Sequence, residues 1–150
     1  MWRTVRALVL VILAASPVSA QNTDIVIRGL SDLSLGVWDG RGPLTATTGL
    51  CVGTRPKRAH EVRIESQGNS FVMKDGAARL TYTVAYNDGG GWREVRAGET
   101  LSGLDSSPLK PCEKGQKLTQ ELRVTVPQDA LAAAPAGQYS DILRLTVRPQ

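Results

Sequence analysis

Two cysteines and one histidine are the residues of this sequence that could form a disulfide, act in catalysis or bind a metal. Cys51 and Cys112 are its only cysteines, and His60 is its only histidine. In an oxidising compartment two such thiols form a disulfide, and closing the long loop between them would stabilise the fold by about 4 kcal/mol in the chain-entropy model. The alternatives are a catalytic thiol or a pair of cysteine ligands to a metal ion. Neither is favoured, because the cysteines lack Cys-x-x-Cys spacing and the sequence has a single histidine that could serve as a catalytic base or a further ligand. We expect a disulfide between Cys51 and Cys112.

The sequence lacks the common motifs of enzyme catalysis. A Ser-His-Asp or Cys-His arrangement would have to use His60, which lies in a charged run over residues 55–61 and which we interpret as a solvated turn residue. There is no Gly-x-Ser-x-Gly elbow, no phosphate-binding loop with lysine and no His-Glu-x-x-His. We therefore expect no enzyme activity, no bound metal and no cofactor.

One concentration of positive charge stands out, formed by Arg55, Lys57 and Arg58, with Arg63 a few strand positions further along. Such a cluster could bind a polyanion, for example lipopolysaccharide or extracellular DNA. The alternative is a solvated loop whose charge is balanced by the two neighbouring glutamates, and the sequence favours this second interpretation.

The N-terminus has the parts of a secretory signal peptide. Arg3 and Arg6 precede an unbroken apolar run over residues 7–15, which is too short to span a bilayer. The small residues after Pro17 fit a signal-peptidase site with cleavage after Ala20. An uncleaved membrane anchor is the alternative, and the polar residues that come next disfavour it.

A signal peptide over residues 1–20 leaves residues 21–150 for a single exported domain. No second apolar run follows, so we expect no membrane-spanning segment after cleavage. Subtracting Arg3 and Arg6 from the 18 Lys and Arg leaves 16, against 14 Asp and Glu. This near balance gives no reason to expect nucleic acid as a partner.

Apolar and polar residues alternate along much of the chain, which is the period of a half-buried β-strand. The clearest series are Leu80, Tyr82, Val84 and Tyr86; Leu122, Val124 and Val126; and Leu143, Leu145 and Val147. Shorter candidate strands lie at 25–28, 33–38, 44–51, 61–66 and 71–74, and the one candidate helix lies at 128–134. Many short strands with one long-range disulfide predict an all-β fold, an immunoglobulin-like β-sandwich.

The C-terminal segment resembles that of a known family. Residues 135–141 read Pro-Ala-Gly-Gln-Tyr-Ser-Asp and run into the alternating strand at 142–147, after which the sequence ends at Gln150. This is similar to the closing motif of spore coat protein U domain proteins, the secreted subunits of archaic chaperone–usher pili. The Leu-Ser-Leu-Gly-Val-Trp-Asp segment at 33–39 and the cysteine-bearing strand at 44–51 resemble early segments of the same family.

The resemblance implies a sandwich that lacks its final strand and is completed by a partner. An N-terminal strand of the next subunit, or a periplasmic chaperone before assembly at an outer-membrane usher, would add to the open edge. The implied acceptor edge is Leu143, Leu145 and Val147, and the implied donor strand carries Ile25, Ile27 and Gly29. The protein would pass through the periplasm to the cell surface or the extracellular space.

Two questions remain open from the sequence. Residues 21–32 are long enough to be a donor strand or the domain's own first strand, but not both; in the second case the chain would accept a neighbour without donating, as a terminal or minor subunit does. The sandwich could also be complete. The protein would then be a stand-alone periplasmic or secreted binding module that uses the hairpin at 87–92 or the basic loop.

Overall fold

The described part of the chain is all-β, with two short helices. The computed structural model describes residues 22–115 and 118–150, so the predicted signal peptide lies outside the described residues. The strands are β1 (Asp24–Arg28), β2 (Leu44–Arg55), β3 (His60–Ser66), β4 (Val72–Asp75), β5 (Ala78–Thr81), β6 (Thr83–Asn87), β7 (Trp92–Val95), β8 (Thr100–Leu104), β9 (Ser107–Pro108), β10 (Gln120–Val126) and β11 (Leu143–Pro149), and the helices are α1 (Leu109–Glu113) and α2 (Gln128–Ala133).

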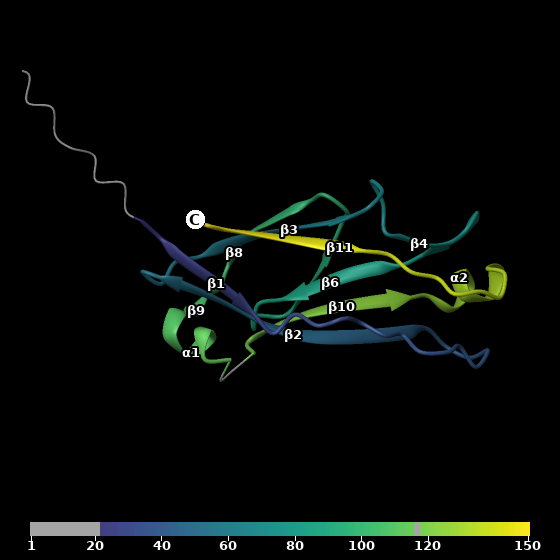
Figure 1. The fold of residues 1–150 in the computed structure, drawn as a ribbon, viewed down its shortest axis with the longest axis horizontal. Coiled ribbons are helices and arrows are strands. Elements are labelled where there is room, and N and C mark those ends of the chain that lie inside the picture. Colours follow the sequence, from purple (N-terminus) through teal and green to yellow (C-terminus); the bar gives the residue numbers. More distant parts are fainter. Residues whose placement is uncertain (1–21, 116–117) are drawn as a thin grey trace, which may run out of the picture.

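The strands form two main sheets and a hairpin (Figure 1). The larger sheet has the order β1-β2-β10-β6-β7, and β9 adds to β2 in parallel at its end. The smaller sheet has the order β11-β3-β8, with antiparallel pairing throughout. The β4–β5 hairpin is linked to the segment before β11 by the backbone bonds between Lys74 and Ser140.

The core lies between the inward faces of these sheets, as the period-two pattern predicts. Along β10 every second residue is buried, and the same alternation places Val62 and Ile64 of β3 in the interior. The remaining buried hydrophobic residues of the core come from both sheets and from β5 of the hairpin, and they include Leu50, Val52, Leu80, Val84, Tyr86, Val95 and Leu104. The predicted all-β class is confirmed.

The predicted disulfide between Cys51 and Cys112 is also confirmed. It joins β2 to α1, a five-residue helix that the sequence did not predict because Pro111 and the short length hide any helical period. Gly53 explains how α1 approaches β2 so closely: a Cβ on Gly53 would lie 2.7 Å from the Cβ of Cys112. A side chain at this position would push the helix away from the strand.

The strand predicted at 33–38 does not form, and residues 29–43 have an irregular path. Gly36, Gly40 and Gly42 all adopt positive φ, which breaks the extended conformation that pairing requires. Leu33 and Leu35 nevertheless pack against the core. In this segment the alternating pattern therefore reflects the partial burial of the two leucines, although the segment pairs with no strand of the described chain.

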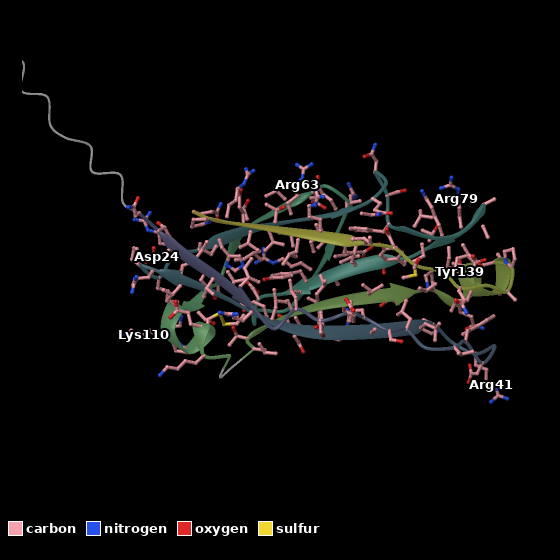
Figure 2. The ribbon with its side chains drawn as sticks, in the orientation of Figure 1. Asp24, Arg41, Arg63, Arg79, Lys110 and Tyr139 are labelled. Atoms are coloured by element: carbon pink, nitrogen blue, oxygen red, sulfur yellow. A yellow bond between two sulfur atoms is a disulfide. The ribbon has the colours of Figure 1, made fainter. Side chains whose placement is uncertain are left out.

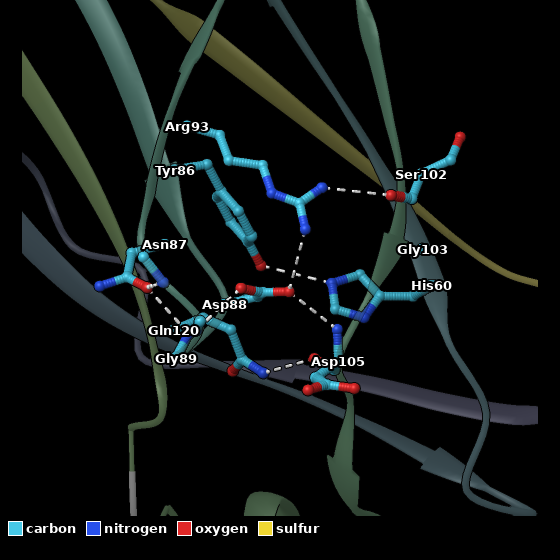
Figure 3. Close-up of polar contacts among 12 residues, drawn as sticks. His60, Tyr86, Asn87, Asp88, Gly89, Arg93, Ser102, Gly103, Asp105 and Gln120 are labelled. Atoms are coloured by element: carbon cyan, nitrogen blue, oxygen red, sulfur yellow. Dashed lines mark hydrogen bonds and ion pairs between the residues drawn. The ribbon is translucent and has the colours of Figure 1, made fainter.

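His60 is not the solvated turn residue that we expected from its charged neighbours. It begins β3 with its side chain on the inward face, and it is fully buried. The ring Nδ1 lies 2.9 Å from Ser106 Oγ. Nε2 lies 3.4 Å from Tyr86 Oη, as Figure 3 shows. Burial lowers the pKa of His60, and the nearby carboxylates of Asp88 and Asp105 oppose this in part. Every second residue of β3 from position 60 to position 64 faces the core, and this alternation determines the burial of His60 despite the charged loop before it.

Candidate functional site: a groove beside the last strand

Strand β11 forms one edge of the smaller sheet. It pairs antiparallel with β3, so that Leu145 lies opposite Ile64 and Val147 lies opposite Val62. Among the described residues no strand pairs with its other edge. That edge therefore presents backbone N–H and C=O groups without a partner in a ladder.

The inward face of β11 is less covered than that of its neighbour. Val62 and Ile64 are 0% exposed, whereas Leu143, Leu145 and Val147 pack on the same core but are only half-buried. Both strands place aliphatic side chains at the paired positions Val62–Val147 and Ile64–Leu145, so the difference in burial comes from what lies beyond β11. Nothing in the described chain covers the outer side of these three residues completely.

A groove of about 680 Å³ follows this edge. Its floor includes Ile64, Tyr82 and Val124, and Leu143 and Leu145 line it on the β11 side. Residues 30–36, here called the wall segment, line it as well. In Figure 1 the chain after β1 runs along β2, and β10 and β6 lie between it and β11 in this view. We call this feature the β11 groove.

The segment that resembles the family's closing motif anchors the start of β11. The Asp75 carboxylate accepts a hydrogen bond from the backbone N–H of Gln138 at 2.9 Å. Gly137 permits this approach, because a Cβ there would lie 2.2 Å from Asp75 Oδ2. The Tyr139 hydroxyl donates to the Pro135 carbonyl at 2.6 Å, which closes the turn. The motif thus fixes where β11 begins relative to the β4–β5 hairpin.

Asp141 completes this anchor from inside the groove. One carboxylate oxygen accepts hydrogen bonds from the Tyr82 hydroxyl at 2.5 Å and from Ser66 Oγ at 2.7 Å. Burial, together with the hydrogen bond to Asp141, raises the pKa of Tyr82, which stays protonated as a donor. These contacts connect the segment before β11 with the end of β3 and with the junction between β5 and β6 at one end of the groove. Sequence patterns did not predict this cluster, because its three residues are far apart along the chain.

The residues of the possible donor strand lie within the domain itself. Ile25 and Ile27 belong to β1, which pairs antiparallel with the second half of β2 from Asp24 opposite Arg55 to Arg28 opposite Cys51. Both isoleucines are 36% exposed. Gly29 follows the strand with positive φ and packs close to Leu118. Residues 24–28 therefore serve as the domain's own first strand in this structure.

The four cations of the predicted basic patch lie in two separate places. Arg55 forms an ion pair with Asp24 across β1 and β2, and Lys57 is exposed in the turn that follows. The backbone N–H of Arg58 donates to Thr54 Oγ1 at 3.0 Å. Arg63 instead lies on the outer face of β3 and pairs with Glu65 at 2.9 Å, well separated from Asp24 in Figure 2. The structure therefore does not bring Arg63 together with the other three cations.

Within the described ranges, no helix is long and apolar enough to cross a membrane. The two helices have five and six residues.

No family model matches the sequence, and no curated protein matches it either. The resemblance to spore coat protein U domains therefore depends on the quoted residues alone. Among solved structures, the fold is similar to a chain from a study entitled "Chaperone-tip adhesin complex is vital for synergistic activation of CFA/I fimbriae biogenesis", with a TM-score of 0.58 and 17% identity. The match covers 86% of this chain and 42% of that chain. At this identity the likeness shows that the protein has a fold found in a fimbrial assembly complex.

Proposed function

We propose that this protein is an exported, non-enzymatic subunit or minor component of a surface pilus, and that it accepts a β-strand from a partner at β11. The observation that carries the proposal is the one-sided pairing of β11 above a groove, with its inward residues half-exposed. The likeness to a chain from a fimbrial chaperone–adhesin study supports the proposal at the level of the fold.

Strand addition fits this edge physically. Main-chain hydrogen bonds to the unpaired side of β11 would supply affinity, and every second side chain of the incoming strand would enter the groove. The floor offers apolar contacts through residues such as Ile64 and Val124, and Leu143 and Leu145 would become fully buried. Removing this apolar surface from water provides the driving force.

The position of β1 supports a subunit that accepts without donating. To donate residues 24–28, the chain would have to break the β1–β2 ladder and the Asp24–Arg55 ion pair. It would also uncover the side of β2 that lies next to Cys51. A terminal or minor subunit needs only the acceptor function, so we propose that position in the fibre.

A periplasmic chaperone and an outer-membrane usher are the partners that follow from this role. A chaperone strand would cover the β11 groove before assembly and would then be replaced by a strand of a neighbouring subunit. In transit the protein would be periplasmic, and after assembly it would lie at the cell surface.

The proposal can be tested with strand peptides and the purified chain without residues 1–20. The probes are a peptide copying residues 21–32, which carries Ile25 and Ile27 on one face of an extended strand, and an alternating Val-Thr decapeptide. A ligand that binds the folded state raises its melting temperature, so at least one probe should do so, whereas a scrambled peptide should not.

Two variants localise the effect. Leu145→Thr, on the groove side of β11, should weaken peptide binding at least tenfold, while Thr146→Lys, on the other face of the same strand, should leave it unchanged. Circular dichroism checks that both variants are folded. A stable wild-type monomer whose melting temperature ignores both alternating peptides would contradict the proposal and would favour a stand-alone binding module.

A further inference from the structure

A second cavity meets the β11 groove at Ile142 but has a different chemistry. It measures about 740 Å³ and is bounded by the outer faces of β3 and β11, the loop after β3 and the turn between β7 and β8. Its polar lining includes Arg63, Glu65, Gln67, Asn69 and Arg144. We call it the arginine cleft; Figure 2 labels Arg63 on its β3 side.

The two arginines of the cleft have different roles. Arg63 is held by Glu65, whose Oε1 accepts from both Nε and Nη2 of the guanidinium at 2.9 Å. Arg144 lies opposite Glu65 in the β11–β3 ladder, and within the described part of the chain its guanidinium has no ion pair or hydrogen bond. Glu65 therefore fixes one arginine, and the other keeps its donors for a ligand.

The turn between β7 and β8 leaves room for a ligand beside these side chains. Gly98 has positive φ, and its N–H donates to the Ile64 carbonyl at 2.8 Å, which ties the turn to β3. A Cβ on Gly98 would lie 3.5 Å from Arg63 Nη2. Together with Ala97, it gives the cleft a floor of small residues.

The remaining lining suits a polyhydroxylated molecule. Gln67 and Asn69 are exposed, and their side-chain amides make no hydrogen bond to other described residues. Amides can donate to and accept from hydroxyl groups. Ile142, which is 64% exposed, offers an apolar surface at the rim for the C–H face of a ring.

From this arrangement we propose that the arginine cleft binds a saccharide that carries a carboxylate. Arg144 would hold the carboxylate through paired N–H donors, Arg63 would add positive charge, and the two amides would contact ring hydroxyls. With two guanidinium groups and one carboxylate, the cleft favours an anionic ligand over a neutral one. This inference does not depend on strand addition at β11.

The test is a titration of the isotope-labelled protein with sodium glucuronate, followed by NMR of backbone and arginine side-chain signals. Glucuronate should shift the signals of residues 66–69 and of Gly98, and glucose should bind at least tenfold more weakly. Arg144→Gln should weaken glucuronate binding at least tenfold. Arg148→Gln is the matched control, because Arg148 lies on the same strand opposite Glu61 and outside the cleft.

Three outcomes would overturn the proposal. The first is the absence of any shift at 50 mM glucuronate. The second is equal binding by the two arginine variants, which would place the ligand elsewhere. The third is binding of acetate or inorganic phosphate as strong as that of glucuronate, which would reduce the cleft to an adventitious anion site. Thermal unfolding confirms that both variants keep the wild-type fold.

Discussion

The first and last strands of the described chain each lie at the edge of a sheet, and the two edges are completed differently. β1 covers the half of β2 that carries Cys51, and α1, linked through Cys112, packs against both strands. β11 has β3 on one side and the groove on the other. A disulfide and a helix lie at the β1 end, whereas among the described residues no strand pairs with the free side of β11. Under the proposed function, the part of the sandwich that is closed by the disulfide serves stability, and the free edge of β11 serves recognition.

Removing the disulfide should have the largest effect, and it should act on the closed end. Replacing Cys51 and Cys112 by alanine is expected to lower the free energy of unfolding by about 4 kcal/mol, because the unfolded chain regains the entropy of a long loop. Urea unfolding of the oxidised protein and the variant measures the difference, with reduced wild-type protein as the reference. A loss below about 1 kcal/mol would mean that the β1 end does not depend on the covalent link.

Truncations at opposite positions of β3 and β11 compare the covered and the open strand directly. Ile64→Ala should cost about 3 kcal/mol, the usual loss for a fully buried aliphatic side chain. Leu145→Ala, at the opposing position, should cost about 1 kcal/mol, because part of its side chain is already in water. Equal losses in urea unfolding would show that the inward face of β11 is as well covered as that of β3.

The stability should depend on pH through His60. Burial lowers the pKa of His60 in the folded protein below the value of the unfolded chain, about 6.5. The unfolded chain then binds the proton first, so the stability from His60 is complete above about pH 6.5 and decreases as the pH falls below it. One proton can contribute a slope of at most about 1.4 kcal/mol per pH unit. The His60→Gln variant should have a flatter profile between pH 7 and pH 5; an unchanged slope would assign the acid sensitivity to other groups.

The smallest predicted effect concerns the turn that starts β11. Gly137→Ala should lower stability by about 1 kcal/mol, because its Cβ would displace the Asp75 carboxylate and break the bond to Gln138 N–H. Gly68→Ala is the control, since the nearest atom to its Cβ is 4.0 Å away and its φ is not positive. Thermal unfolding of both variants gives the comparison. Similar melting temperatures would indicate that the turn does not fix β11.

Sequence patterns predicted the features that depend on residues close together in the chain or on the number of cysteines. The period of two found the inward faces of β3, β10 and β11, and the count of cysteines found the disulfide. The burial of His60 was not predicted, because the prediction used the polarity of the adjacent residues. The register of β3, which places the His60 side chain on the inward face, decides its burial. The irregular path of residues 29–43 was missed because the alternation of Leu33 and Leu35 reports burial and not pairing.

The sites depend on contacts between distant segments, which the sequence pattern does not contain. The resemblance to a pilus family pointed to β11 as an edge, but the wall segment and the Tyr82–Asp141–Ser66 cluster come from tertiary packing. In the same way, the sequence grouped Arg63 with the basic turn. The pairing of β3 with β11 places it near Arg144, and only the ladder register reveals that proximity.

The central claim is that the free edge of β11 accepts a strand, and amide hydrogen exchange of β11 tests it most directly. In an antiparallel edge strand every second N–H points away from its neighbour, so these amides should exchange quickly in the isolated chain while those bonded to β3 are protected. On addition of an alternating peptide or a chaperone strand, the fast amides should become at least tenfold slower. Uniform slow exchange along β11 in the isolated monomer, with no change when a strand is offered, would contradict the account.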